Sequence, residues 1–134
     1  MATKASIIYT ARDQQMLQAL SLTPLDTQQL LKMSETFDQP FINDRTLRER
    51  MQEHAAAGWV NTFTYATTRT GKLNYYKLAP EGYRLLYGHK EPLPKRSFFN
   101  EISPALQRHT HHLASVIVQT NRQAHRHGYR LIHQ

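Results

Sequence analysis

The sequence contains no cysteine in its 134 residues. Disulfide bonds, thiolate zinc sites and cysteine nucleophiles are therefore excluded. Long apolar runs are also lacking, and none approaches the roughly 18 residues that would suggest a membrane span. The N-terminus offers only "SIIY", Ser6–Tyr9, where a secretory signal needs a longer apolar region. These absences predict a cytoplasmic protein without a membrane partner.

Sequence motifs of the common enzyme classes are missing as well. The chain has no nucleophile motif, no Gly-rich phosphate loop and no HExxH step. Its acidic residues are scattered, and their spacing suggests no general acid–base pair. The sequence therefore predicts a binding protein rather than an enzyme, with no cofactor.

Positive charge is what the sequence does have. The formal net charge is +7, and the sequence pI is about 9.9. Residues 89–134 carry +5 of this charge and residues 1–88 carry +2. Such a balance favours a polyanionic partner, with nucleic acid before an anionic membrane surface.

Capping residues and apolar periodicity predict three helices in the first half of the chain. The first starts after Thr10 and ends before Pro24, and the second follows Asp26 or Thr27 and reaches about residue 34. The third opens at residue 43 or 44 and ends at Gly58, a plausible left-handed cap. Its expected buried face is Leu47, Met51 and Ala55, at i, i+4 and i+8.

A β-hairpin and a short helix follow. "WVNTFTYAT" alternates and is rich in aromatic and β-branched residues, "TRTGK" is typical of a turn, and "LNYYKLA" is the return strand. Trp59 is expected to close the core. Of Tyr75 and Tyr76, one is expected to face inward and the other outward. Pro80 suits the first turn of a fourth helix.

This order predicts a mainly α fold with a small β-hairpin: a winged helix-turn-helix plus a long C-terminal helix. We assign residues 1–88 to the winged domain, 89–98 to a proline-containing linker, and 99–134 to the long helix and tail. The long helix is expected to start at Ser103 or Pro104 and to reach Gly128.

The third helix is the expected DNA-reading element, because in helix-turn-helix domains such a helix enters the major groove. Arginine can bind guanine edges or phosphate, and glutamine can read adenine. Cations at the hairpin tip suit a phosphate backbone. The expected DNA-binding residues are Arg45, Thr46, Arg48, Gln52, Arg69 and Lys72. A protein-docking face and a merely solvated face are the alternatives, since Glu49 on this side would repel phosphate.

Several segments resemble the winged-helix part of the bacterial replication-relaxation family, which is associated with plasmids and mobile elements. They are "ARDQQMLQAL", "DTQQLLKM", "TLRERMQEHAAAGWV", "YYKLAPEGYRLL" and "HHLAS". The similarity covers about residues 10–128, although the helix–glycine–strand step also occurs in MarR-like and PadR-like repressors. The resemblance implies DNA binding linked to plasmid replication control.

The long C-terminal helix carries an apolar stripe with gaps of three and four residues. The stripe is the expected homodimer interface: Leu106, His109, Leu113, Val116, Ile117 and Ala124. The alternative is that this stripe folds back onto its own domain. His109 and His112 are spaced for metal chelation, but Glu101 is the only nearby carboxylate, so we predict no metal site.

The sequence thus predicts a sequence-specific double-stranded DNA-binding protein, a homodimeric regulator of transcription or plasmid replication. One alternative is an interaction module that docks on a larger replication or mobilisation protein without binding DNA itself. A metal-dependent enzyme is the third hypothesis.

Overall fold

The structure is a computed structural model that describes residues 7–65 and 73–128 of the chain. The expected hairpin tip, with Arg69 and Lys72, and the tail after Gly128 lie outside the described residues. Their predicted roles therefore stay predictions.

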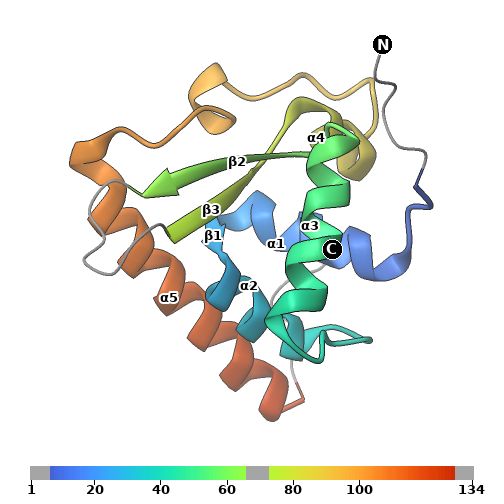
Figure 1. Ribbon diagram of the computed structural model, residues 1–134, viewed down its shortest axis with the longest axis vertical. Helices are drawn as coiled ribbons and strands as arrows, with labels where there is room; N and C mark the ends of the chain where they lie inside the picture. Colours follow the sequence, from blue (N-terminus) through green and yellow to red (C-terminus); the bar gives the residue numbers. More distant parts are fainter. Residues whose placement is uncertain (1–6, 66–72, 129–134) are drawn as a thin grey trace.

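The fold is mainly helical, with a small antiparallel sheet and a long C-terminal helix (Figure 1). The elements in chain order are α1 (Ala11–Leu22), β1 (Leu25–Asp26), α2 (Thr27–Met33), η1 (Ser34–Thr36), α3 (Asp44–Ala56), β2 (Val60–Tyr65), β3 (Leu73–Leu78), α4 (Pro80–Tyr87), η2 (Arg96–Phe98) and α5 (Pro104–Arg126). This coarse architecture and the positions of the five α-helices confirm the sequence prediction.

Local capping chemistry explains where the first three helices begin. Thr10, Asp26 and Asn43 are their N-caps, and each side chain accepts a hydrogen bond from a backbone N–H of the first turn. At α2 the bond is reciprocal: the Gln29 amide donates to Asp26 Oδ1 over 2.7 Å, and the Asp26 amide donates to Gln29 Oε1 over 3.0 Å. Gly58, with φ of +82°, follows α3 as predicted.

The sheet has three strands in the order β1-β3-β2, one more than the hairpin that the sequence predicts. Strand β1 contains only Leu25 and Asp26, which pair with Tyr76 and Tyr75 of β3. Two residues are too few to show an alternating pattern, so the sequence does not predict this strand. Its hydrogen bonding to β3 defines it.

Both faces of the sheet are covered. Tyr76 belongs to the main core, whereas Tyr75 packs on the opposite face with Tyr65 and Ile102. The prediction that one of the two tyrosines faces solvent is therefore wrong, because Tyr75 and Tyr76 are only 0 % and 6 % exposed. The segment before α5 covers the second face, and the Ile102 amide donates to the Tyr75 hydroxyl oxygen over 2.9 Å.

The buried side of α3 differs from the prediction at one position. Leu47 and Met51 are fully buried, but Ala55 is exposed and His54 is buried in its place. Trp59, just beyond the helix, is half-buried and packs on the core as expected. In a helix, the positions three and four residues after Met51 lie on nearly the same side. The apolar pattern therefore predicts Ala55 as the buried residue, whereas the structure buries His54, which has a buried partner.

Helix α5 runs along one side of the molecule beside α2 (Figure 1). Its buried residues are Gln107, Ala114, Val118 and Asn121, a face next to the predicted stripe rather than the stripe itself. Polar contacts hold the two helices together: His111 Nε2 lies 2.7 Å from Asp26 Oδ2, and the Gln29 side chain donates to Ser115 Oγ over 2.9 Å. The cap of α2 therefore also anchors α5.

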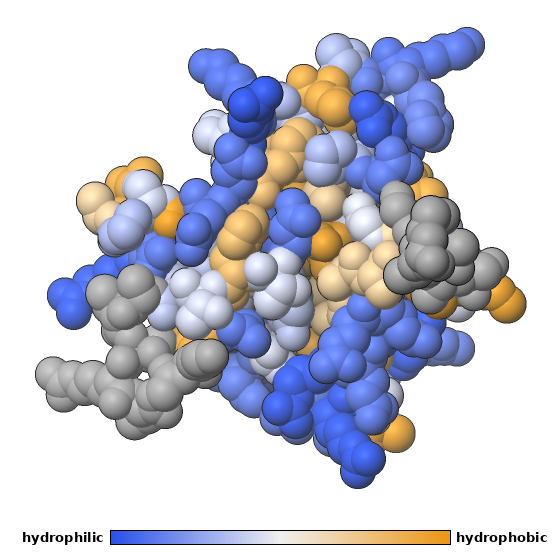
Figure 2. Space-filling model, turned by 45° about the horizontal axis from the view of Figure 1, so that its top comes forward, coloured by the Kyte–Doolittle hydropathy of each residue, from blue (hydrophilic) through white to orange (hydrophobic). Residues whose placement is uncertain are grey.

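The surface is mixed in polarity. On the face shown in Figure 2, hydrophilic residues occupy most of the area and apolar ones form a band across the middle. Ile8 and Ile42 are the most exposed large apolar side chains in the described ranges, at 81 % and 93 %. Within residues 7–65 and 73–128, no helix combines the length and apolarity needed to cross a bilayer.

Candidate nucleic-acid interface

The outward side of α3 carries the polar residues that the sequence singled out. All of its members are exposed: Arg45, Thr46, Arg48, Glu49 and Gln52. They lie on the side of the helix away from buried Leu47 and Met51, and the Asn43 cap fixes where the helix begins. We call these five residues the α3 polar face. Arginine, threonine and glutamine side chains can all donate hydrogen bonds to base edges or phosphates.

The arginines of the α3 polar face are held only loosely. Arg45 Nε lies 3.4 Å from Glu49 Oε2, and Arg48 Nη2 lies 3.9 Å from Asp44 Oδ1. The Arg45 and Arg48 side chains remain 82 % and 55 % exposed. Solvent-exposed ion pairs of this kind contribute little to stability. Either guanidinium can therefore exchange its carboxylate for a phosphate or a base edge without loss of the fold.

A third arginine of the helix, Arg50, has a structural role instead. Its Nε donates to Asp13 Oδ1 over 2.9 Å, and its Nη1 donates to Glu53 Oε1 over 2.9 Å. A further bond of 2.8 Å reaches the Ile8 carbonyl oxygen. The bonds to Asp13 and Ile8 join α3 to α1 and to the segment that leads into it. With a second bond to Asp13 from Nη2, Arg50 uses four of its five donors within the protein.

Asp13 lies at the centre of this network and is fully buried. His54 Nε2 lies 2.8 Å from its Oδ1, and the Thr10 amide donates to its Oδ2 over 2.9 Å. Burial alone would raise the pKa of Asp13, but hydrogen bonds from Arg50, His54 and Thr10 hold it well below its ordinary range. The Asp13 carboxylate therefore fixes the position of α3 relative to α1.

The sequence did not reveal this network. Asp13 reads as a first-turn acidic residue of α1, and His54 reads as one of many polar residues of α3. The only signal is that both residues fall beside apolar periodic positions. The His54 ring also packs against Trp59, with centroids 5.0 Å apart, and its Nδ1 has no partner among the described residues.

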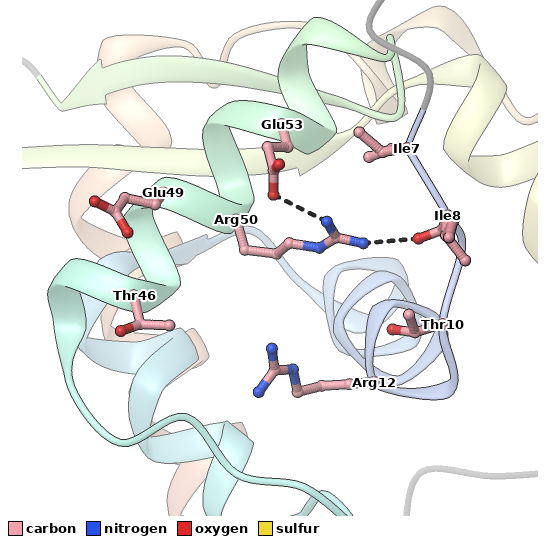
Figure 3. A pocket seen from close by; sticks show the side chains of 8 residues that line it. All are labelled: Ile7, Ile8, Thr10, Arg12, Thr46, Glu49, Arg50 and Glu53. Carbon is pink, nitrogen blue, oxygen red and sulfur yellow. Dashed lines mark hydrogen bonds and ion pairs between the residues drawn. The ribbon is translucent and has the colours of Figure 1, made fainter.

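An open cleft of about 650 Å³ lies between α3 and the start of α1 (Figure 3). Its lining residues are Ile7, Ile8, Thr10, Arg12, Thr46, Glu49, Arg50 and Glu53. Thr46 and Glu49 belong to the α3 polar face, so the cleft continues that face toward α1. Arg12, which sequence reasoning did not single out, points from α1 toward α3 in this cleft (Figure 3).

The predicted dimer stripe of α5 is largely open to solvent. Leu106, Leu113 and Val116 are 56 %, 46 % and 47 % exposed. His109 is also exposed, whereas Ile117 and Ala124 are half-buried. Because α5 packs on α2 through its neighbouring face, this stripe does not fold back onto the described part of its own chain, except partly at Ile117.

The histidines of α5 are spread along the helix. His109 and His112 are exposed, and His111 binds Asp26. Across residues 7–65 and 73–128, no three His, Asp or Glu side chains come together as a metal site requires.

The comparisons with known proteins add no relative: no protein-family model, no curated protein and no solved structure matches the chain. The resemblance to the replication-relaxation family therefore depends on the sequence segments alone.

Proposed function

We propose that the protein binds double-stranded DNA in a sequence-specific manner and acts as a homodimeric, cytoplasmic regulator of transcription or plasmid replication. The observation that carries this proposal is the α3 polar face, with Arg45, Arg48 and Gln52 exposed on a helix whose opposite side is buried. In this proposal the protein is a binder and not an enzyme.

The order of elements supports a winged helix-turn-helix for residues 1–88. Three helices are followed by the β2–β3 hairpin, and α2 packs against α3. Such domains use the third helix as the reading element. With its side chains an α-helix is about 10–12 Å across, which suits a major groove about 12 Å wide.

The exposed stripe of α5 supports the homodimer. Three apolar side chains with close to half of their surface in solvent are typical of an interface that a second copy covers. The Asp26–His111 contact ties α5 to α2, which precedes α3 in the chain. A dimer formed through α5 would therefore hold two reading helices in a defined relation, as required for half-sites about 34 Å apart.

One alternative has observations in its favour. Glu49 lies within the α3 polar face, and Ile42, just before the helix, is 93 % exposed. A face with a carboxylate and a bare isoleucine also suits docking onto another protein. That function predicts no measurable duplex binding at about 0.1 M salt.

Selection from random duplexes followed by a salt series tests the proposal. We expect a selected site with dyad symmetry and an affinity that falls steeply with salt as counterions are released. Arg45→Ala or Arg48→Ala should each cost about 1–3 kcal/mol in binding if the arginine reads a base. Thermal unfolding of these variants should match wild type, because both ion pairs are exposed.

Arg108→Ala is the matched control, since Arg108 is an exposed arginine on α5 away from the α3 polar face. Wild-type binding by an Arg45→Ala, Arg48→Ala double variant would reject the assignment of this face. A chain that selects no duplex at all would reject DNA binding.

A further inference from the structure

Arg12 differs from the other cations around α3. Arg45, Arg48 and Arg50 each have a carboxylate partner. Arg12 makes no hydrogen bond or ion pair with any residue in the described ranges, although a guanidinium offers five donors. It is nevertheless half-buried and has a defined position.

A ring holds the Arg12 side chain in place. Its Cζ lies 3.9 Å from the centroid of the Phe41 ring, a cation–π contact. Phe41 is itself buried, at 7 % exposure, in the loop that leads into α3. Stacking uses the face of the guanidinium and leaves its N–H donors, which lie in the plane, free. The contact with Phe41 therefore orients the N–H donors of Arg12 but leaves them without hydrogen-bond acceptors among the described residues.

The donors of Arg12 face the cleft beside the α3 polar face (Figure 3). Two carboxylates also line this cleft, and they oppose the binding of an anion. Glu53 is neutralised by Arg50 at 2.9 Å, and Glu49 lies 3.4 Å from Arg45. The Arg12 charge is the one in the cleft that has no counter-charge among the described residues.

We propose that this cleft seats a backbone phosphate of the DNA on Arg12, at the edge of the groove that α3 enters. This inference rests on the proposed function and adds a contact site to it. Planar, two-pronged donors match a phosphate, and phosphate contacts beside the reading helix fix its register on the duplex. Arg12 is thus a positioning residue, and it carries no sequence preference.

The salt dependence of duplex binding tests this site. The loss of one phosphate contact makes the slope of log K against log salt less negative by about 0.9. Arg12→Gln should therefore make the slope less steep by about one unit. It should weaken binding to all duplexes by the same factor. If the affinities converge near 1 M salt, the same slope change corresponds to about an eightfold loss at 0.1 M. The preference for the selected site over random duplex should stay at the wild-type ratio.

Two further variants make the test specific. Arg108→Gln removes an equal charge from α5 and should leave the slope unchanged. Phe41→Leu keeps the charge but removes the ring beneath it, so binding should weaken while most of the slope remains. Urea unfolding of each variant establishes that the loss lies in binding.

The outcomes separate this inference from the function on which it rests. Duplex binding by wild type with an unchanged slope in Arg12→Gln overturns the phosphate site and leaves DNA binding intact. Equal slope changes in Arg12→Gln and Arg108→Gln also overturn it, because net charge would then explain both. If the wild-type chain binds no duplex, both proposals are overturned.

Discussion

At the scale of single residues, the buried Asp13 carboxylate decides how α3 is held. Its oxygens accept hydrogen bonds from the Thr10 backbone and hydroxyl and from the Arg50 guanidinium, and they contact His54. Arg50 and His54 both come from α3, so a single carboxylate joins α1 to the helix that carries the polar face. Removing one partner of such a buried network leaves the other partners uncompensated.

We therefore expect Asp13→Asn to lower the free energy of unfolding by about 3 kcal/mol at pH 7, as measured in urea. The native network depresses the pKa of Asp13. The carboxylate therefore stabilises the fold fully at pH values above its pKa in the unfolded chain, about 3.9, and this stabilisation is lost progressively as the pH falls below that value. The stability difference between wild type and Asp13→Asn should therefore shrink from pH 7 to pH 3.

Asp44→Asn provides the control for this prediction. Asp44 is a half-buried first-turn carboxylate that lies 3.9 Å from Arg48, and its loss should cost less than about 1 kcal/mol. A wild-type advantage over Asp13→Asn that is constant from pH 7 to pH 3 would show that the Asp13 carboxylate is not the source of the effect.

Single residues also show what a sequence can and cannot predict. The caps at Thr10, Asp26 and Asn43 were predictable because donor and acceptor lie within one turn of each other. The contacts from Asp13 to Arg50 and His54 span 37 and 41 residues, and no local pattern reports them. Arg12 was overlooked for the same reason, since its partner Phe41 lies far away in the chain.

At the scale of elements, a glycine lets α4 pack closely on Trp59, just before β2, and on Leu78 of β3. A Cβ on Gly82 would lie 2.2 Å from the Trp59 carbonyl oxygen and 3.0 Å from Leu78 Cδ1. That carbonyl is fixed, because it accepts a hydrogen bond of 2.9 Å from the Ala79 amide. The close approach of α4 to the strand therefore requires a residue without a side chain.

Gly82→Ala should consequently destabilise the protein by about 1–3 kcal/mol, as measured by urea unfolding. Helix propensity alone predicts the opposite sign, a gain of about 1 kcal/mol for alanine over glycine. Ala55→Gly measures that propensity at an exposed site of α3, where it should cost about 1 kcal/mol. A Gly82→Ala variant more stable than wild type would mean that α4 does not pack this closely.

The helices and strands were easier to predict than the contacts that each makes with other elements. The five α-helices and the two hairpin strands follow from caps, prolines and periodicity, which act within a few residues. Strand β1 and the covering of the second sheet face by the segment before α5 depend on contacts with β3. Lys77 shows this most clearly: its buried ammonium donates to the Ser97 and Asn100 carbonyl oxygens, over 3.0 and 2.7 Å.

At the scale of the whole molecule, α5 has one face packed on the core and an adjacent apolar face exposed to solvent. One buries Ala114 and Val118 against the core, and the adjacent face leaves Leu106, Leu113 and Val116 in solvent. The apolar periodicity predicted that α5 would carry an apolar stripe. It did not predict which face of α5 would pack against the rest of its own chain. The face that meets its own chain makes the Asp26–His111 and Gln29–Ser115 contacts, which join the N-cap and first turn of α2 to α5.

If the exposed stripe joins two copies, Leu113→Lys should convert the dimer to a monomer, since it places a charge at the centre of the stripe. Sedimentation equilibrium measures the change. The fold should survive, because Leu113 is 46 % exposed and the buried side of α5 is untouched. Leu22→Lys is the matched control: Leu22 lies on α1 and is 48 % exposed, so the same change there should leave the dimer intact.

If the protein binds DNA as proposed, the same pair of variants tests whether association contributes to that binding. A monomeric Leu113→Lys chain should still bind a half-site, because the α3 polar face is unchanged, but it should lose the extra affinity for a site with two halves. Leu22→Lys should keep that advantage. Equal binding of the two-part site by Leu113→Lys and Leu22→Lys, with only one of them dimeric, would separate dimer formation from DNA reading and require another role for the α5 stripe.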